Sequence, residues 1–339
     1  MSYAVIFNVV LPIMLFVVAG YIFQKLGKFE SDEGSNLIGY AMKVAIPSMI
    51  IVALAEEPIS SYVQYLEFFG TFLLVSSITF LVALVFAVLR RMPLLEGSYF
   101  AATASLSNTC MIALPILVLL MGKEGAIFGI LGVINLIIGL QVMSFLYDIH
   151  HAPEGESKWG NIASSLWNTA KQPYFVALII GIILSASGLK LPVTISTTLE
   201  LFGNTTAPVA LFAVGLDLDF SVFRKNILAI FESVIFKLIA MPILAWFLCQ
   251  WFGLTPASTV AVVLCSSVAA AKCQYALAKQ KHIYVEETAA IVAATTILSI
   301  ATLAVVVIWL NSHYPEVFEM EKNFHIGAHH AAAAGKFVD

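Results

Sequence analysis

Long apolar segments separated by short polar connections make up most of this chain. Ten segments are each close to the roughly 20 residues that a helix needs to cross a bilayer. They are apolar around nearly the whole helical circumference, which is typical of lipid-facing helices rather than amphipathic ones. No ten-residue alternating pattern repeats, which argues against membrane-spanning strands. The predicted spans are Ala4–Phe23, Leu37–Ala55, Phe68–Leu89, Tyr99–Met121, Ala126–Leu146, Pro173–Leu189, Ile195–Leu216, Ile227–Phe252, Ala257–Ala278 and Thr288–Leu310.

The composition supports a polytopic membrane protein and excludes several other classes. Hydrophobic residues make up 60% of the 339 residues and charged residues 11%, against about 25% charged in soluble proteins. The formal net charge of -4 and the lack of a basic run exclude a nucleic-acid partner. The four cysteines form no CxxC pair and the seven histidines fall outside the spans, so no metal site, disulfide framework or cofactor is expected.

The basic residues predict how the spans are oriented. With the N-terminus outside, the inner loops hold ten of the 17 basic residues, whereas the outer loops hold only Lys123 and Lys190. This asymmetry follows the positive-inside rule. We therefore expect ten spans in the cell membrane, with both termini outside. The inner-loop residues are Lys25, Lys28, Arg90, Arg91, Lys158, Lys171, Arg224, Lys225, Lys279 and Lys281.

The longest connection, Tyr147–Gln172, divides the chain into two halves, residues 1–146 and 173–311, followed by a tail over 312–339. Five spans per half is an odd number, so the second half enters the membrane from the opposite side and any structural repeat is inverted. Three residue matches share one offset of 161 residues. They are Pro47 with Pro208, Glu56 with Asp217, and Ser60 with Ser221. The fold class predicted is an all-α polytopic membrane protein of two inverted five-helix repeats.

Spans four and nine have the most polar interiors. Span four holds Ser107-Asn108-Thr109, and span nine holds serines, a lysine and a glutamine. A helix broken inside the membrane frees backbone groups that protein, water, an ion or a substrate must satisfy. Interrupted segments at matching places in two halves predict a binding site near the midplane. The candidate binding residues are Ser48, Ser107, Asn108, Thr109, Ser266, Ser267, Lys272 and Gln274.

These residues resemble the auxin efflux carrier family, which includes plant PIN-type auxin exporters and bacterial carriers of malonate and related acids. The resemblance covers essentially all ten spans and rests on the order and spacing of several short elements. They are the Pro47 region, Ser107-Asn108-Thr109 with Pro115, Ala207-Pro208-Val209-Ala210-Leu211-Phe212 followed by Gly215 and Leu216, and Lys237 with Pro242.

The resemblance implies the fold of bile-acid sodium symporters. In that fold, spans one, two, six and seven form a scaffold domain and the others a transport domain, with broken helices four and nine crossing. Substrate would lie beside the crossing, with Asn108 as the matching polar residue, and would move by an elevator-like displacement. A homodimer through the scaffold is expected as well. Span nine departs from the family pattern, because Ala269-Ala270-Ala271-Lys272 stands where relatives commonly have a proline.

Three lysines lie within predicted spans, where ionisable groups are costly. Lys43 is near enough to the inner end to extend its amino group to the interface; the alternative is an ion pair or a role in coupling. Lys237 is deeper, and we expect an ion pair with Glu232 or Asp217, a contact with a helix end, or a role in coupling. Lys272 either reaches the interface or faces the crossing, where it would attract a substrate carboxylate or replace a sodium ion.

The other singled-out residues also have structural alternatives. Ser107, Asn108 and Thr109 are suited to hydrogen bonds between helices as well as to substrate. Pro47, Pro115 and Pro208 are expected to kink or shape helices rather than to bind. Glu56 and Asp217 are weak candidates for titrating groups at the ends of their spans.

We therefore predict a secondary transporter of a small organic anion, a mono- or dicarboxylate such as malonate. Its coupling would be to protons, to sodium or to neither. The chain has no GxxxxGK[ST] motif, which argues against ATP coupling. The alternatives are a carrier of an auxin-like aromatic acid or another solute and, more distantly, an intramembrane enzyme or a sensor on a transporter fold. The spans lack the paired aspartates or histidines that such an enzyme would need.

Overall fold

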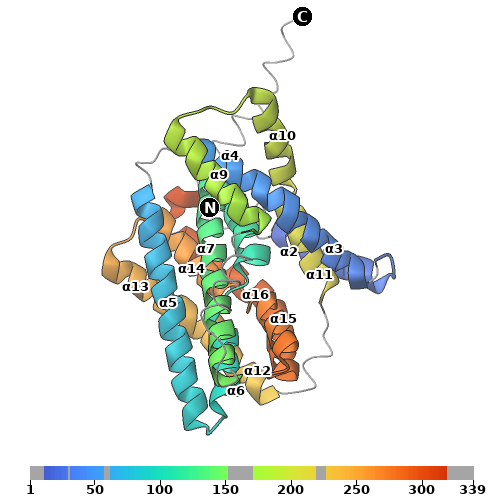
Figure 1. The fold of residues 1–339 in the computed structure, drawn as a ribbon, viewed down its shortest axis with the longest axis vertical. Coiled ribbons are helices and arrows are strands. Elements are labelled where there is room, and N and C mark those ends of the chain that lie inside the picture. Colours follow the sequence, from blue (N-terminus) through green and yellow to red (C-terminus); the bar gives the residue numbers. More distant parts are fainter. Residues whose placement is uncertain (1–10, 30, 57–61, 152–170, 219–226, 319–339) are drawn as a thin grey trace, which may run out of the picture.

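The computed structural model describes residues 11–29, 31–56, 62–151, 171–218 and 227–318 (Figure 1). Within these ranges every regular element is a helix, and two extended residues form an isolated bridge. The first half contains α2 (Leu11–Lys25), α3 (Ser31–Tyr40), η2 (Ala41–Ala45), α4 (Ile46–Glu56), α5 (Tyr62–Leu89), α6 (Leu94–Ser105), η4 (Thr109–Ala113) and α7 (Leu114–His151). The second half contains α9 (Pro173–Ser187), α10 (Val193–Asn204), α11 (Thr206–Leu216), α12 (Ile227–Val234), η6 (Ile235–Ala240), α13 (Met241–Phe252), α14 (Pro256–Ser267), α15 (Lys272–Lys281) and α16 (Val285–His313).

The prediction of an all-helical, multi-pass membrane protein is confirmed. Among the described residues, six helical segments are long and apolar enough to cross a membrane, and three apolar helices are shorter. One of the six, Thr109–Tyr147, contains a kink at Gly122 (φ 58°, ψ -129°) between predicted spans four and five. The count of ten spans and their orientation stay predictions.

One boundary differs from the expected one, and several expected features lie outside the described residues. Helix α7 continues to His151, beyond the predicted start of the linker at Tyr147. The reason is that the chain has no glycine or proline between Tyr147 and Pro153 to end the helix. The rest of the linker, the tail and the matched pair Ser60 and Ser221 fall largely or wholly outside the described residues.

Three segments of wider π-helix, η2, η4 and η6, share one sequence feature. The α-helix that follows each of them has proline as its second residue: Pro47, Pro115 and Pro242. Proline has no N–H and its ring clashes with the carbonyl four residues earlier, so the preceding turn widens. The prolines thus shape three helices without ending them. Pro208 lies instead near the start of α11, just after the α10–α11 junction at Thr205.

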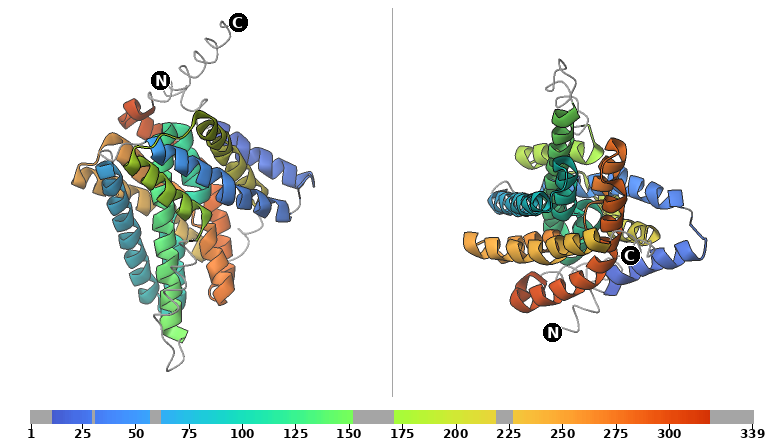
Figure 2. Two further views of the ribbon diagram at one scale, coloured as in Figure 1. Left: turned by 45° about the horizontal axis from the view of Figure 1, so that its top comes forward. Right: turned by 90° about the horizontal axis from the view of Figure 1, so that it is seen from below.

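The helices of the molecule form two groups. In the first group, α4 packs on α9 and α10, and α2 packs on α11; Figures 1 and 2 show these helices together with α3 at one end. Backbones touch where α2 meets α11: a Cβ on Gly20 would lie 2.1 Å from Phe212 O, and one on Gly215 2.0 Å from Val17 O. Small residues permit such close approach in membranes.

The second group contains α5–α7 and α12–α16, and it holds most of the core. Aromatic rings pack between α5 and α7, where Phe68 lies 5.0 Å from Phe128 between ring centroids. Large apolar side chains on α5 and α13, such as Leu81 and Trp251, point outward and are 57% and 84% exposed. Outward apolar side chains are what a lipid environment requires. Whether these two groups act as the predicted scaffold and transport domains, and move relative to each other, stays a prediction.

Candidate functional site at the helix crossing

Both predicted broken spans are interrupted where their sequences become polar. Helix α6 ends at Ser105 and η4 begins at Thr109, with Leu106 in an extended conformation (φ -82°, ψ 116°). Helix α14 ends at Ser267 and α15 begins at Lys272, with Ala271 extended as well (φ -67°, ψ 125°). Each break therefore leaves a short stretch of backbone without helical hydrogen bonds.

The two breaks satisfy each other's backbone groups. Asn108 N–H donates to Ala269 O at 2.9 Å, and Ala271 N–H donates to Leu106 O at 2.9 Å. Ser107 and Ala270 form an antiparallel bridge between them. The Ala270 N–H turns the other way and donates to Thr295 Oγ1 of α16 at 3.2 Å. Broken helices four and nine thus cross as predicted, although span nine lacks the family proline.

Lys237 reaches this crossing from η6 and is completely buried. Its Nζ donates to Ser107 Oγ at 2.6 Å and to Ser266 O at 3.1 Å, and it lies 3.1 Å from Met241 Sδ. The Ser266 carbonyl belongs to the last turn of α14, where helical carbonyls lack partners and cations are favoured. The expected ion pair is wrong: Glu232 pairs with Arg90 and Asp217 with Lys272. Of the alternatives for Lys237, the contact with a helix end is the one in the structure.

Lys272 lies at the edge of the crossing rather than inside it. It is the first residue of α15, two residues after Ala270, and it forms an ion pair with Asp217. The two side chains are 36% and 30% exposed. Asp217 directly follows α11, so the pair links the first group of helices to the broken span. Lys43 is exposed on η2, in keeping with a long side chain that reaches out of the apolar region.

The other predicted binding residues differ in what their side chains contact. The hydroxyl of Thr109 donates to Gly132 O, and those of Ser266 and Ser267 donate to carbonyls of their own helix, so all three are used internally. Ser48 is buried on α4, in the other group of helices. The structure brings Ser107 and the Ser266 carbonyl together with Lys237, which sequence reasoning had not placed among the binding residues. The sequence feature that indicated a special role for Lys237 was its position deep within predicted span eight.

Gln274 is a candidate whose side chain has unused hydrogen-bonding capacity. It lies on α15 in the first turn after the break and is completely buried. Neither its Oε1 nor its Nε2 has a hydrogen-bond partner. Buried amides are normally satisfied, so an unpaired one indicates a place where a water molecule or ligand atom completes the site.

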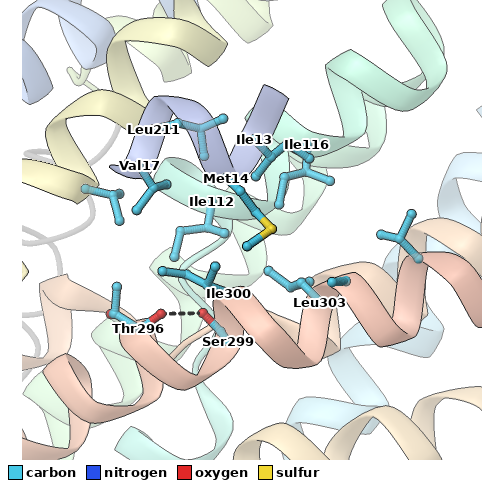
Figure 3. A pocket seen from close by; sticks show the side chains of 13 residues that line it. Ile13, Met14, Val17, Ile112, Ile116, Leu211, Thr296, Ser299, Ile300 and Leu303 are labelled. Atoms are coloured by element: carbon cyan, nitrogen blue, oxygen red, sulfur yellow. Dashed lines mark hydrogen bonds between the residues drawn. The ribbon is translucent and has the colours of Figure 1, made fainter. Parts of the chain in front are cut away.

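An apolar cavity lies beside the crossing, between the two groups of helices (Figure 3). Its walls come from α2, α11, η4, α7 and α16, and its polar side chains are Thr296 and Ser299. A second apolar cavity lies between α4 and α9 on one side and η4 and α7 on the other. Neither cavity offers a charged partner for an anion. They mark imperfect packing along the boundary between the groups.

A family model described as membrane transport protein matches residues 5–307. The chain belongs to this family. Membership confirms the resemblance to auxin efflux carriers and makes the protein a membrane transporter.

Two further likenesses agree with this membership. An uncharacterized transporter of Methanothermobacter thermautotrophicus is 23% identical over 299 residues, which cover 87% of this chain and 95% of that protein. A sodium proton antiporter of Methanocaldococcus jannaschii, with its structure determined at pH 8, gives a TM-score of 0.51 at 12% identity. That match covers 89% of this chain and 92% of the antiporter, and it concerns the fold alone.

Proposed function

We propose that this membrane transporter is a secondary active carrier of a small organic anion, a mono- or dicarboxylate such as malonate. The observation that carries the proposal is the crossing of two helix breaks around the buried Lys237. Broken helices supply hydrogen-bonding groups at membrane depth, and a lysine there supplies a positive charge. The unpaired carboxamide of Gln274 adds a donor close to the same break.

The electrostatics of the crossing favour an anion over a cation. The helical segments that follow both breaks, η4 and α15, begin without a side-chain cap. Uncapped N-termini present free N–H groups and a partial positive charge. Lys237 already occupies the negative end of α14 through the Ser266 carbonyl. Lys272 adds a second cation at the rim, next to the start of α15.

An elevator-type movement is part of the proposal. The boundary between the two helix groups is lined by apolar side chains and contains two cavities. Apolar surfaces lack directional bonds, so one group can slide along the other without leaving many hydrogen bonds unpaired. The crossing would travel with the second group, carrying the substrate between the two sides.

Uptake into proteoliposomes tests the proposal. A thermal-shift panel of malonate, acetate, an auxin-like aromatic acid, an amino acid and a neutral sugar first identifies stabilising ligands. Uptake of those ligands is then measured with and without sodium and a pH gradient, which also identifies the coupling ion. We expect malonate to stabilise the protein and to cross. A protein that is neither stabilised by any anion nor moves one contradicts the proposal.

A further inference from the structure

The pair Lys272–Asp217 suggests how an anion would be admitted to the site. Building on the proposed function, we infer that Asp217 is an internal competitor for the substrate carboxylate. In the present conformation Asp217 is the ion-pair partner of Lys272, and an incoming substrate carboxylate replaces Asp217 in that pair. Because Asp217 follows α11 and Lys272 begins α15, the exchange also releases a connection between the two helix groups. Substrate binding and freedom to move are thereby linked.

Lys272 is placed to bind both carboxylates in turn. It lies two residues beyond the Ser107–Ala270 bridge, so its backbone is close to the crossing, while its side chain is partly exposed. The side chains of Lys272 and Asp217 are 36% and 30% exposed, so both can be reached from outside the protein. Lys237, by contrast, is fully buried, and it contacts the Ser107 hydroxyl, the Ser266 carbonyl and the Met241 sulfur. An anion that approaches the crossing beside Asp217 would therefore meet Lys272 before Lys237.

The strength of the pair is suited to exchange. Ion pairs with this degree of exposure contribute little, because water and ions compete for both partners. A substrate carboxylate can therefore replace Asp217 without a large barrier, which would not hold for a buried pair. Removal of the competitor should tighten substrate binding by about two- to fivefold, the factor that corresponds to a pair worth up to about 1 kcal/mol.

A second ion pair supplies a matched control. Lys123 Nζ lies 3.4 Å from Glu200 Oε1, and the two side chains are 39% and 41% exposed. This pair also joins the two helix groups, because Glu200 is on α10 and Lys123 is on α7. Lys123, however, is 15 residues beyond Asn108 and directly follows the kink of α7 at Gly122. A substitution at Glu200 loosens the same boundary without touching the crossing.

The experiment measures the apparent Kd of malonate from thermal-shift titrations of the purified full chain, with malonamide as the uncharged comparison. Asp217→Asn should lower the Kd about two- to fivefold, and Asp217→Ser is the second variant should the first not fold. Lys272→Gln should raise the Kd by about tenfold. Glu200→Gln should leave it within about twofold of wild type. The double variant Asp217→Lys/Lys272→Asp keeps the ion pair with its charges exchanged. It should therefore have the thermal stability of wild type but not its affinity for malonate.

The outcomes separate the inference from the proposed function. If wild type responds to malonate but Asp217→Asn and Asp217→Ser bind it no more tightly, Asp217 is no competitor and the inference is wrong. Recovery of malonate affinity in the exchanged variant would also overturn it, because Lys272 would then act only through the pair. Failure of wild type to bind or move any carboxylate in the panel would instead overturn the proposed function.

Discussion

Lys237 and Lys272 approach the same crossing from different directions and meet different surroundings. Lys237 is enclosed by protein and donates to a hydroxyl and a carbonyl, both uncharged. Lys272 is partly exposed and has a carboxylate as its partner. Enclosing a charge is costly unless an opposite charge compensates it, whereas a solvated pair costs little and gains little. The difference indicates that Lys237 is kept for function and that Lys272 is free to change partners.

Replacement of Lys237 should have the largest effect on transport. Lys237→Met keeps the length of the side chain but removes the donor to Ser107 and Ser266, and we expect uptake to fall by more than about tenfold. The same change removes a desolvated charge, so the unfolding midpoint should stay level or rise. Uptake assays and thermal unfolding of the same preparation check both parts. Lys43→Met, at an exposed lysine of η2, is the control; uptake by Lys237→Met near the wild-type rate would remove Lys237 from the site.

Loss of the Ser107 hydroxyl should have the next largest effect. Ser107→Ala leaves the Lys237 amino group without its 2.6 Å acceptor, and an unpaired buried donor costs about 1–3 kcal/mol. We expect a lower unfolding midpoint and uptake reduced several-fold. Ser267→Ala is the matched control, because that hydroxyl bonds only to Val263 O of its own helix. Equal losses in the two variants would mean that the contact with Lys237 has no special weight.

Thr295 tests the backbone of the second break separately from its charges. Thr295→Val removes the acceptor of the Ala270 N–H and should lower the free energy of unfolding by about 1–2 kcal/mol. Thr296→Val is the comparison, because its hydroxyl donates to Val292 O within α16. Chemical unfolding in detergent measures the difference. Thr295→Val as stable as Thr296→Val would show that the break needs no support from α16.

The Lys272–Asp217 pair should contribute least to stability. A double-mutant cycle of Lys272→Gln and Asp217→Asn should give a coupling energy of about 0–1 kcal/mol that shrinks as salt is raised. Unfolding midpoints in low and high salt provide the measurement. A coupling energy of several kcal/mol that salt does not change would contradict this expectation. Lys272 would then be held as firmly as Lys237 and would not be free to change partners.

Sequence patterns predicted the helices and both breaks for a simple reason. Lipid requires every helix to be apolar, so Ser107-Asn108 and the stretch before Lys272 stand out from their surroundings. The partners of the lysines were not predictable in this way. Which residue faces the crossing depends on how η6 rotates and where α11 ends, and both follow from packing between distant segments. The continuation of α7 to His151 similarly reflects local helix chemistry that an apolar pattern does not record.

The bridge between residues 106–108 and 269–271 is made by main-chain atoms, with support from the hydroxyl of Thr295. Every amino acid except proline carries the same N–H and C=O groups. Residues around the crossing can therefore change, within the limits of size, while the crossing itself persists. A descendant carrier could acquire a different substrate by replacing side chains on a framework that needs no redesign.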